Sequence, residues 1–117
     1  MILTLTHVAI GGAIGSVLRY LMVVLVGTPI ATLLVNVLGS FAMGVLFITL
    51  ASRTSLSPLL MTGVLGGFTT FSAFSLDALK LWNAGDTLHA TLYVLASVIL
   101  SLVAAALGAA IARGAFA

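Results

Sequence analysis

Two rows of uncharged polar side chains recur at helical spacing in a chain that is otherwise strongly apolar. Residues four apart share one face of a helix, and the rows are Thr32, Asn36 and Ser40, and His89, Tyr93, Ser97 and Ser101. Hydroxyl and amide groups donate hydrogen bonds without carrying charge. They can therefore replace part of an anion's hydration shell and still hold the ion loosely enough for conduction. Alternatively, the rows form hydrogen bonds between helices, worth about 0.6 to 2 kcal/mol each in a membrane.

Phenylalanines follow one another at a spacing of three, at Phe68, Phe71 and Phe74. The edge of a phenyl ring is the positive part of its quadrupole and can face an anion. These rings therefore add a second kind of uncharged anion-facing group to the two polar rows.

The composition places these residues in a membrane. Of the 117 residues, 62% are hydrophobic and 5% are charged, against roughly 25% charged in soluble domains. So few charges cannot cover a soluble fold, which excludes a soluble enzyme, a nucleic-acid-binding domain and a disordered tail. The chain has no cysteine, so disulfides and thiolate chemistry are excluded as well.

Four apolar stretches are long enough to cross the hydrocarbon, which takes about 20 helical residues. They cover residues 3–26, 30–50, 57–80 and 88–112. We predict an all-α membrane protein with a single four-helix transmembrane domain over residues 1–117 and both ends on one side of the membrane.

The third stretch carries a glycine pair and a threonine pair, at residues 66–67 and 69–70. Both are poor helix formers, so we predict a break in the third helix at mid-membrane. The freed backbone groups must then be buried in protein or line a polar cavity, and freed carbonyls can coordinate cations. The alternative is a continuous helix whose threonine and serine hydroxyls bond back to their own turn.

The few charges give almost no instruction for orientation in the membrane. Arg53 and Arg113 lie on the side of the termini, against Lys80, with Arg19 able to reach that second side. Such a chain can insert into the membrane in both orientations, and two copies of opposite orientation can then pair. The alternative is a single orientation that the charges set only weakly. We expect Asp77 toward the membrane edge, where an exposed pair with Lys80 contributes little.

Small residues also recur at four-residue spacing and let helices approach closely in lipid. The rows are Gly11 and Gly15, Gly12 and Ser16, Ser40 and Gly44, and Ala104, Gly108 and Ala112. We expect them to serve packing within the chain and in a homodimer.

Three motifs resemble those of a known family. Residues 11–20 read Gly-Gly-Ala-Ile-Gly-Ser-Val-Leu-Arg-Tyr and match a first-helix Gly-Gly-x-x-Gly-x-x-x-Arg-Tyr pattern. Residues 36–44 match a second-helix Asn-x-x-Gly-Ser-Phe-x-x-Gly pattern, and residues 63–75 resemble a third-helix signature. In length, number of spans and order of motifs, the whole chain resembles the CrcB/Fluc fluoride channels of microbes.

The resemblance implies an antiparallel, dual-topology homodimer in the cytoplasmic membrane that lets fluoride leave the cell and relieves its toxicity. By motif position it implies a fluoride pathway lined by Thr32, Asn36, Phe71, Ser72, Phe74, Tyr93, Ser97 and Ser101. It places Arg19 in a vestibule that attracts anions, and a structural sodium ion at the dimer centre, held by the backbone carbonyls of Gly66 and Thr69. Ala73 stands where the family often has Thr, which leaves the phenylalanine pair intact.

Two other functions stay open for a chain of this kind. A small four-span multidrug exporter shares its size and dual topology but needs a membrane-embedded carboxylate, and the first span has no Asp or Glu. A structural subunit of a larger membrane complex would carry no ion flux alone. We do not expect an enzyme, because the sequence has no nucleophile–base–acid set. The expected partners are fluoride, a second copy and the lipid bilayer, with no nucleic acid.

Overall fold

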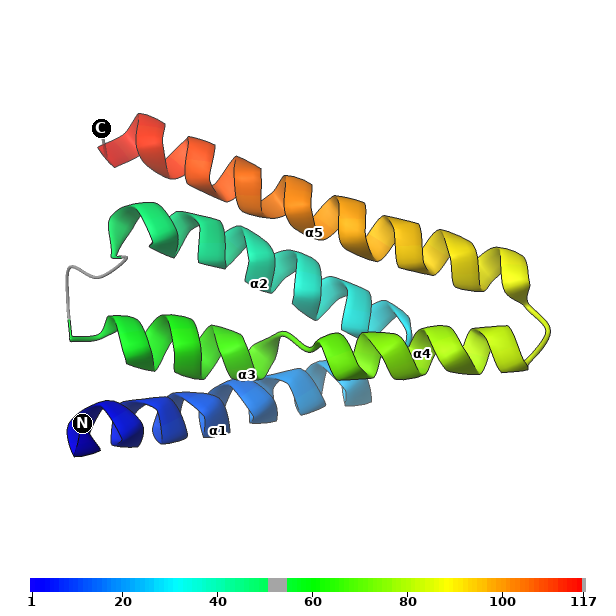
Figure 1. Cartoon of the computed structure of the whole chain (residues 1–117), viewed down its shortest axis with the longest axis horizontal. Coiled ribbons are helices and arrows are strands. Elements are labelled where there is room, and N and C mark those ends of the chain that lie inside the picture. The colour runs from blue at the N-terminus through cyan, green and yellow to red at the C-terminus, as the bar shows by residue number, and fades with distance from the viewer. Residues whose placement is uncertain (51–54, 117) are drawn as a thin grey trace.

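The computed structural model describes residues 1–50 and 55–116, and every regular element in this part is helical. The elements are α1 (Ile2–Val26), α2 (Ile30–Thr49), the π-helix η1 (Pro58–Leu65), the short α3 (Gly66–Phe68), α4 (Phe71–Asn83) and α5 (Thr87–Phe116). Because η1, α3 and α4 run on as one span, the described residues form four helical spans of membrane length, as predicted (Figure 1). The two ends of the chain lie at the same end of the bundle.

The spans differ from the predicted ranges by a few residues at their ends. α4 continues to Asn83 rather than ending near residue 80, because the backbone first leaves the helical region at Gly85, whose φ of 82° suits glycine. α5 continues past residue 112, with Arg113 in its last turn, where a cation is favourable. Arg53, which enters the orientation argument, lies outside the described residues.

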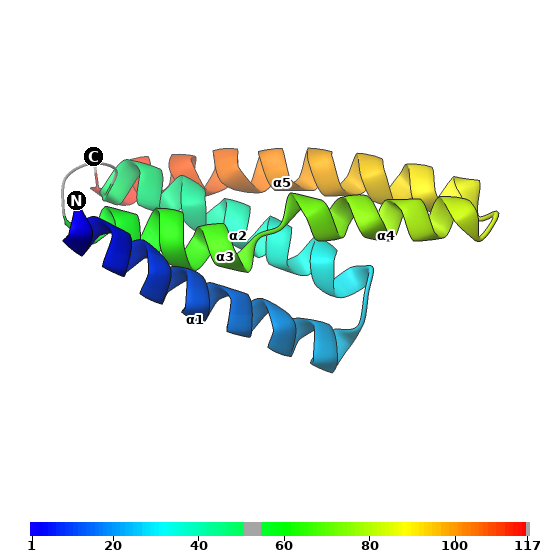
Figure 2. The same ribbon diagram turned by 60° about the horizontal axis from the view of Figure 1, so that its bottom comes forward.

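Two helix pairs make up the bundle. α5 packs along α2, and α1 packs along η1 and α3, while α4 continues beyond them against α5. Figure 2 shows the second half of α1 diverging from the other helices. Tyr20 and Leu25, in this half, are 66% and 82% exposed.

Glycines lie where the backbones of each pair touch. A Cβ added to Gly11 or Gly63 would come within 3 Å of backbone atoms on the opposite helix, and one added to Gly44 or Gly108 would overlap the backbone across the α2–α5 contact. Part of the predicted small-residue rows therefore serves close approach within the chain. The homodimer stays a prediction.

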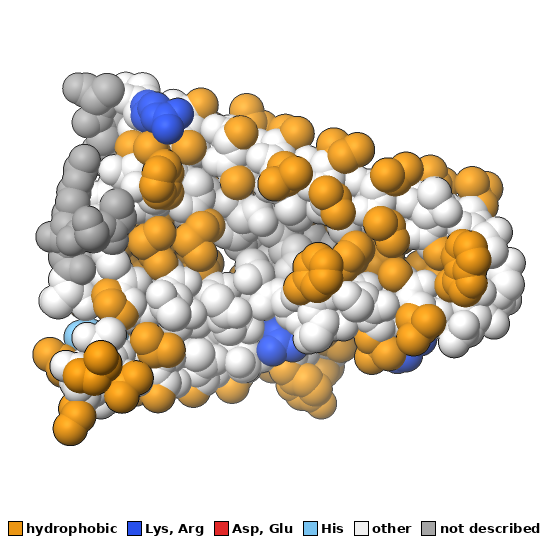
Figure 3. All heavy atoms as spheres, in the orientation of Figure 1, with side chains coloured by type: hydrophobic (Ala, Val, Ile, Leu, Met, Phe, Trp, Pro, Cys, Tyr) orange, Lys and Arg blue, Asp and Glu red, His pale blue; other side chains and the backbone are white. Residues whose placement is uncertain are grey.

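Most large apolar side chains face outward, and Figure 3 shows them spread over the helices. Val35 is fully buried, but Leu88 and Leu102 are 69% and 68% exposed. An apolar surface of this extent has no counterpart on soluble monomers, whereas lipid tails solvate it well. The four helices are accordingly long and apolar enough to cross a membrane.

The third span is broken at Thr69 and Thr70, which confirms the predicted interruption. Both residues are extended, with ψ of 154° and 119°. The glycine pair is helical instead, with Gly66 at φ −62° and ψ −36°, so the expectation that it helps to break the helix is wrong. Gly67 serves close packing, because an added Cβ would lie 2.7 Å from the Gly12 carbonyl oxygen.

Candidate functional site

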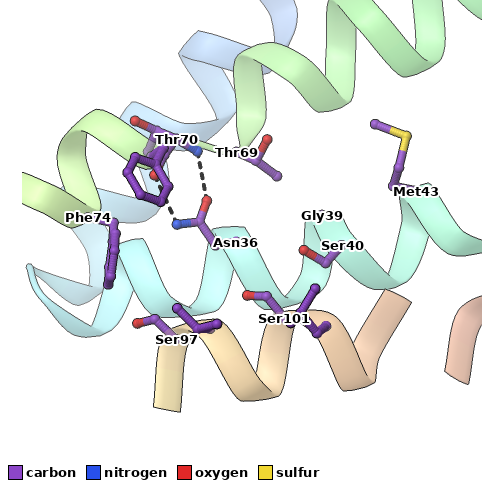
Figure 4. A pocket seen from close by; sticks show the side chains of 12 residues that line it. Asn36, Gly39, Ser40, Met43, Thr69, Thr70, Phe74, Ser97 and Ser101 are labelled. Atoms are coloured by element: carbon purple, nitrogen blue, oxygen red, sulfur yellow. Dashed lines mark hydrogen bonds between the residues drawn. The ribbon is translucent and has the colours of Figure 1, made fainter. Parts of the chain in front are cut away.

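The break is held by a side chain from α2. Asn36 Nδ2 donates to the Thr70 carbonyl at 3.0 Å, and Asn36 Oδ1 accepts from the Thr70 N–H at 2.7 Å (Figure 4). The asparagine amide has the same donor and acceptor as a backbone peptide. It therefore supplies the hydrogen-bond partners that an extended residue would lack in lipid. The second Nδ2–H of Asn36 is not used in this pairing.

These contacts release two backbone carbonyls. In a continuous helix the Thr70 N–H would bond the Gly66 oxygen, and the Ala73 N–H would bond the Thr69 oxygen. The first donates instead to Asn36, and the second to the Thr70 hydroxyl at 3.1 Å. The Gly66 and Thr69 carbonyls thus lose their helical partners. Carbonyl oxygens are the donors that hard cations prefer, so the chemistry of this pair fits a sodium ion.

A cavity of about 380 Å³ lies between α2, the break and α5. Figure 3 shows this face of the molecule hollowed near its middle, over α2. The polar residues that line the cavity are all uncharged: Asn36, Ser40, Thr69, Thr70, Ser97 and Ser101. Phe71 and Phe74 line it as well. A largely apolar cavity with a few converging polar groups is the usual form of a small-ligand site.

Ser97 is the unusual member of this lining. Its side chain is only 5% exposed, yet its Oγ has no hydrogen-bond partner among the described residues. Leaving a buried polar group unpaired costs about 1 to 3 kcal/mol. Such a cost, at a residue that lines the cavity, marks Ser97 as a candidate donor for a ligand that accepts its proton.

The two predicted pathway phenylalanines have different surroundings. Their ring centroids lie 5.3 Å apart, but Phe74 is 8% exposed and Phe71 is 77% exposed. Phe74 also packs on Tyr93, with centroids 5.5 Å apart. Phe74 is therefore part of the core, whereas Phe71 presents its ring at the open side of the cavity.

Three predicted pathway residues do not line the cavity. Thr32 is 2% exposed, and Tyr93 lies behind Phe74 at 8% exposure. Ser72 is exposed, with its hydroxyl 3.3 Å from that of Thr70. The structure thus brings together Asn36, Phe71, Phe74, Ser97 and Ser101 and leaves these three outside.

Asp77 corrects an expectation. It does not lie exposed at the membrane edge but is 5% exposed, and it accepts a hydrogen bond of 3.3 Å from the Tyr93 hydroxyl. Among the described residues it forms no ion pair with Lys80 or any other cation. The sequence position near the end of a span suggested the edge, and only the packing of α4 on α5 places the carboxylate inside.

Arg19 contacts the broken span directly. Its Nε donates to the Gly67 carbonyl at 3.1 Å, and the side chain is partly buried. The guanidinium therefore satisfies a carbonyl in the last turn before the break and keeps its other N–H donors. Its role in attracting anions stays a prediction.

Known proteins that are similar to this chain agree with the geometry of the site. Residues 6–109 match the family model described as CrcB-like protein, Camphor Resistance (CrcB). A relative from Paracoccus denitrificans named Fluoride-specific ion channel FluC is 50% identical, with 97% of this chain and 98% of the relative covered. Relatives of the same name from Ruegeria sp. and Rhizobium etli are 51% and 50% identical, covering 97% and 91% of this chain and 98% and 93% of their own length. The chain is therefore a multi-pass membrane protein that belongs to the CrcB family.

Proposed function

We propose that the protein is a fluoride-selective channel that lets fluoride leave the cell passively across the cytoplasmic membrane and so relieves fluoride toxicity. The names of the relatives support fluoride as the conducted ion. The observation that carries the proposal for this chain is the buried Ser97 hydroxyl, which belongs to a residue that lines the cavity and has no partner among the described residues.

The cavity suits a small anion that must be held only briefly. The Ser97 and Ser101 hydroxyls and the spare Asn36 N–H donate hydrogen bonds that replace hydration. None of these groups carries charge, so the ion is released again, as conduction requires. The edges of Phe71 and Phe74 add weak positive potential along the same wall.

The cavity is open on one side of a single chain, which supports an antiparallel homodimer. Phe71 is 77% exposed and Gly66 is exposed beside the break. A second copy in the opposite orientation would cover this face and complete the two pathways. Weak Lys/Arg bias permits both orientations.

A structural sodium ion completes the proposal. Two break segments meeting on a two-fold axis would present the Gly66 and Thr69 carbonyls of each copy, a set of four hard oxygens. The bound ion would supply positive charge that holds the two breaks together. Within this chain, Asn36 and the Thr70 hydroxyl keep those carbonyls free by taking the amides that would otherwise bond them.

Fluoride efflux from liposomes that contain only this protein tests the function. A fluoride electrode should record release down the fluoride gradient, while chloride is retained. Folded protein without flux would favour the structural-subunit alternative. Flux of a cationic drug driven by a proton gradient would favour the exporter, for which the buried Asp77 is the only embedded carboxylate in the described part.

A separate experiment tests the dual topology. An accessible tag placed at one terminus should be labelled from both sides of the membrane in a single population of cells. Labelling from one side only would contradict the antiparallel dimer, but it would not contradict the proposed fluoride conduction.

A further inference from the structure

The hydroxyl row on α5 continues past the cavity. Ser101 and Ser97 line the cavity, and Tyr93 follows one turn further along the same face. Phe74 lines the cavity, Tyr93 does not, and the two rings pack with centroids 5.5 Å apart. A row of three hydroxyls would therefore offer a fluoride ion a third donor just beyond the cavity wall.

The proton of that third hydroxyl is already in use. The Tyr93 hydroxyl donates to Asp77 Oδ2 at 3.3 Å, and both side chains are buried. A phenol has a single proton, and this hydrogen bond uses it. What Tyr93 presents in other directions is therefore its oxygen lone pairs, which cannot bind an anion.

The surroundings of the tyrosine oxygen agree with an acceptor. The Thr32 and Ser97 side chains lie near the tyrosine oxygen, but Ser97 does not reach hydrogen-bond geometry. The Thr32 hydroxyl can donate to the tyrosine. Asp77 has no ion pair with a cation among the described residues, so its carboxylate depends on the Tyr93 proton.

We propose that Asp77 is a positioning residue that holds the Tyr93 proton away from the cavity and so ends the row of anion donors at Ser97. The inference rests on the proposed fluoride function and adds a specificity element to it. A fluoride ion at Ser97 meets lone pairs at the next step instead of another proton, so it is not trapped. Release is then fast, which conduction needs.

Tyrosine vibrations test the direction of this hydrogen bond. The chain has two tyrosines, so Y20F leaves Tyr93 as the only one, and Tyr20 is 66% exposed. In Y20F protein, ultraviolet resonance Raman spectra should show a donating phenol that does not respond when NaF replaces NaCl. The added substitution D77A removes the acceptor and should shift the spectrum toward an accepting phenol and make it respond to NaF. The matched control D86A removes a carboxylate that is exposed beside His89 and should leave the spectrum unchanged.

A response to NaF with Asp77 intact would overturn the inference, and this measurement needs no Asp77 variant to fold. A spectrum that D77A leaves unchanged would overturn it as well. Neither result depends on ion flux, so both are distinct from a failure of the proposed function, which would appear as unmodified protein that does not conduct.

Efflux from liposomes gives the second readout. D77A should slow fluoride efflux about tenfold, because one extra hydrogen bond to the ion is worth a factor of that order. In the Y93F background the same substitution should change the rate less than twofold, because no proton is released. An equal slowing in both backgrounds would mean that Asp77 acts through its charge or through folding, and would overturn the positioning role.

Discussion

The side chain of Asn36 pairs with the backbone of Thr70 in both directions, through hydrogen bonds of 3.0 and 2.7 Å. One residue of α2 thereby serves both polar backbone groups of the extended residue at the break. The hydroxyl of Thr70 in turn begins α4 by accepting from the Ala73 N–H. The geometry of the third span at its break is consequently fixed from the neighbouring helix.

Removal of this clamp should destabilise the protein. Asn36→Ala leaves the Thr70 N–H and carbonyl unpaired, each at a cost of about 1 to 3 kcal/mol, so we expect a loss of about 2 to 6 kcal/mol in the free energy of unfolding. Asn36→Asp keeps an acceptor for the N–H and should lose less. Unfolding in detergent micelles measures both variants.

The matched control for Asn36 is Asn83→Ala, at the exposed end of α4, which should be close to neutral. Equal stability of Asn36→Ala and Asn83→Ala would show that the clamp does not hold the break.

Ser97→Ala should separate stability from conduction. The hydroxyl has no partner among the described residues, so its removal abolishes an unpaired buried group and should leave stability unchanged or raise it by up to about 1 kcal/mol. Fluoride efflux should fall about tenfold if the hydroxyl binds the ion.

Thr91→Ala serves as its control on the same helix. The Thr91 hydroxyl is exposed and bonds the Thr87 carbonyl within its own turn, so efflux should be unaffected. Normal efflux in Ser97→Ala would remove the observation on which the proposed function depends.

Periodicity and composition predict the spans and the interruption, because both follow from local properties of the chain. Apolar runs of membrane length define the four helices, and β-branched residues at 69–70 locate the break. The same local reasoning fails for Gly66 and Gly67. Glycine is a poor helix former in isolation, but both residues are helical here, and at Gly67 the helix needs glycine because α1 crosses at backbone contact.

Pairings between distant residues could not be read from the sequence. The spacing of Thr32, Asn36 and Ser40 identifies a polar helix face. It does not reveal that the Asn36 amide nitrogen and oxygen both bind Thr70, which is 34 residues away. Asp77 and Tyr93 are 16 residues apart on different helices. The sequence did show a carboxylate within an apolar span. A buried charge needs a partner, so this carboxylate could have indicated a buried hydrogen-bond partner.

The two phenylalanines of the pathway should respond differently to isoleucine. Phe74 is buried against Tyr93, so Phe74→Ile should cost about 1 to 3 kcal/mol through poor packing. Phe71 is 77% exposed in the single chain, so Phe71→Ile should have a small effect on the unfolding of the chain. Both variants lose a ring edge at the cavity and should conduct fluoride more slowly. Efflux at the original rate in both variants would contradict their place in the pathway.

Adjacent glycines of α1 offer an internal test of the packing between α1 and the third span. A Cβ on Gly11 would overlap the Leu59 carbonyl and approach Gly63, whereas a Cβ on Gly12 meets nothing within 4 Å. Gly11→Ala must push α1 away from η1, so the bundle should lose about 1 to 3 kcal/mol of stability. Gly12→Ala adds a methyl group to an open position in a helix and should be neutral or slightly stabilising. Unfolding in detergent compares the two variants, and equal stability would mean that α1 does not contact the third span as closely as its glycines indicate.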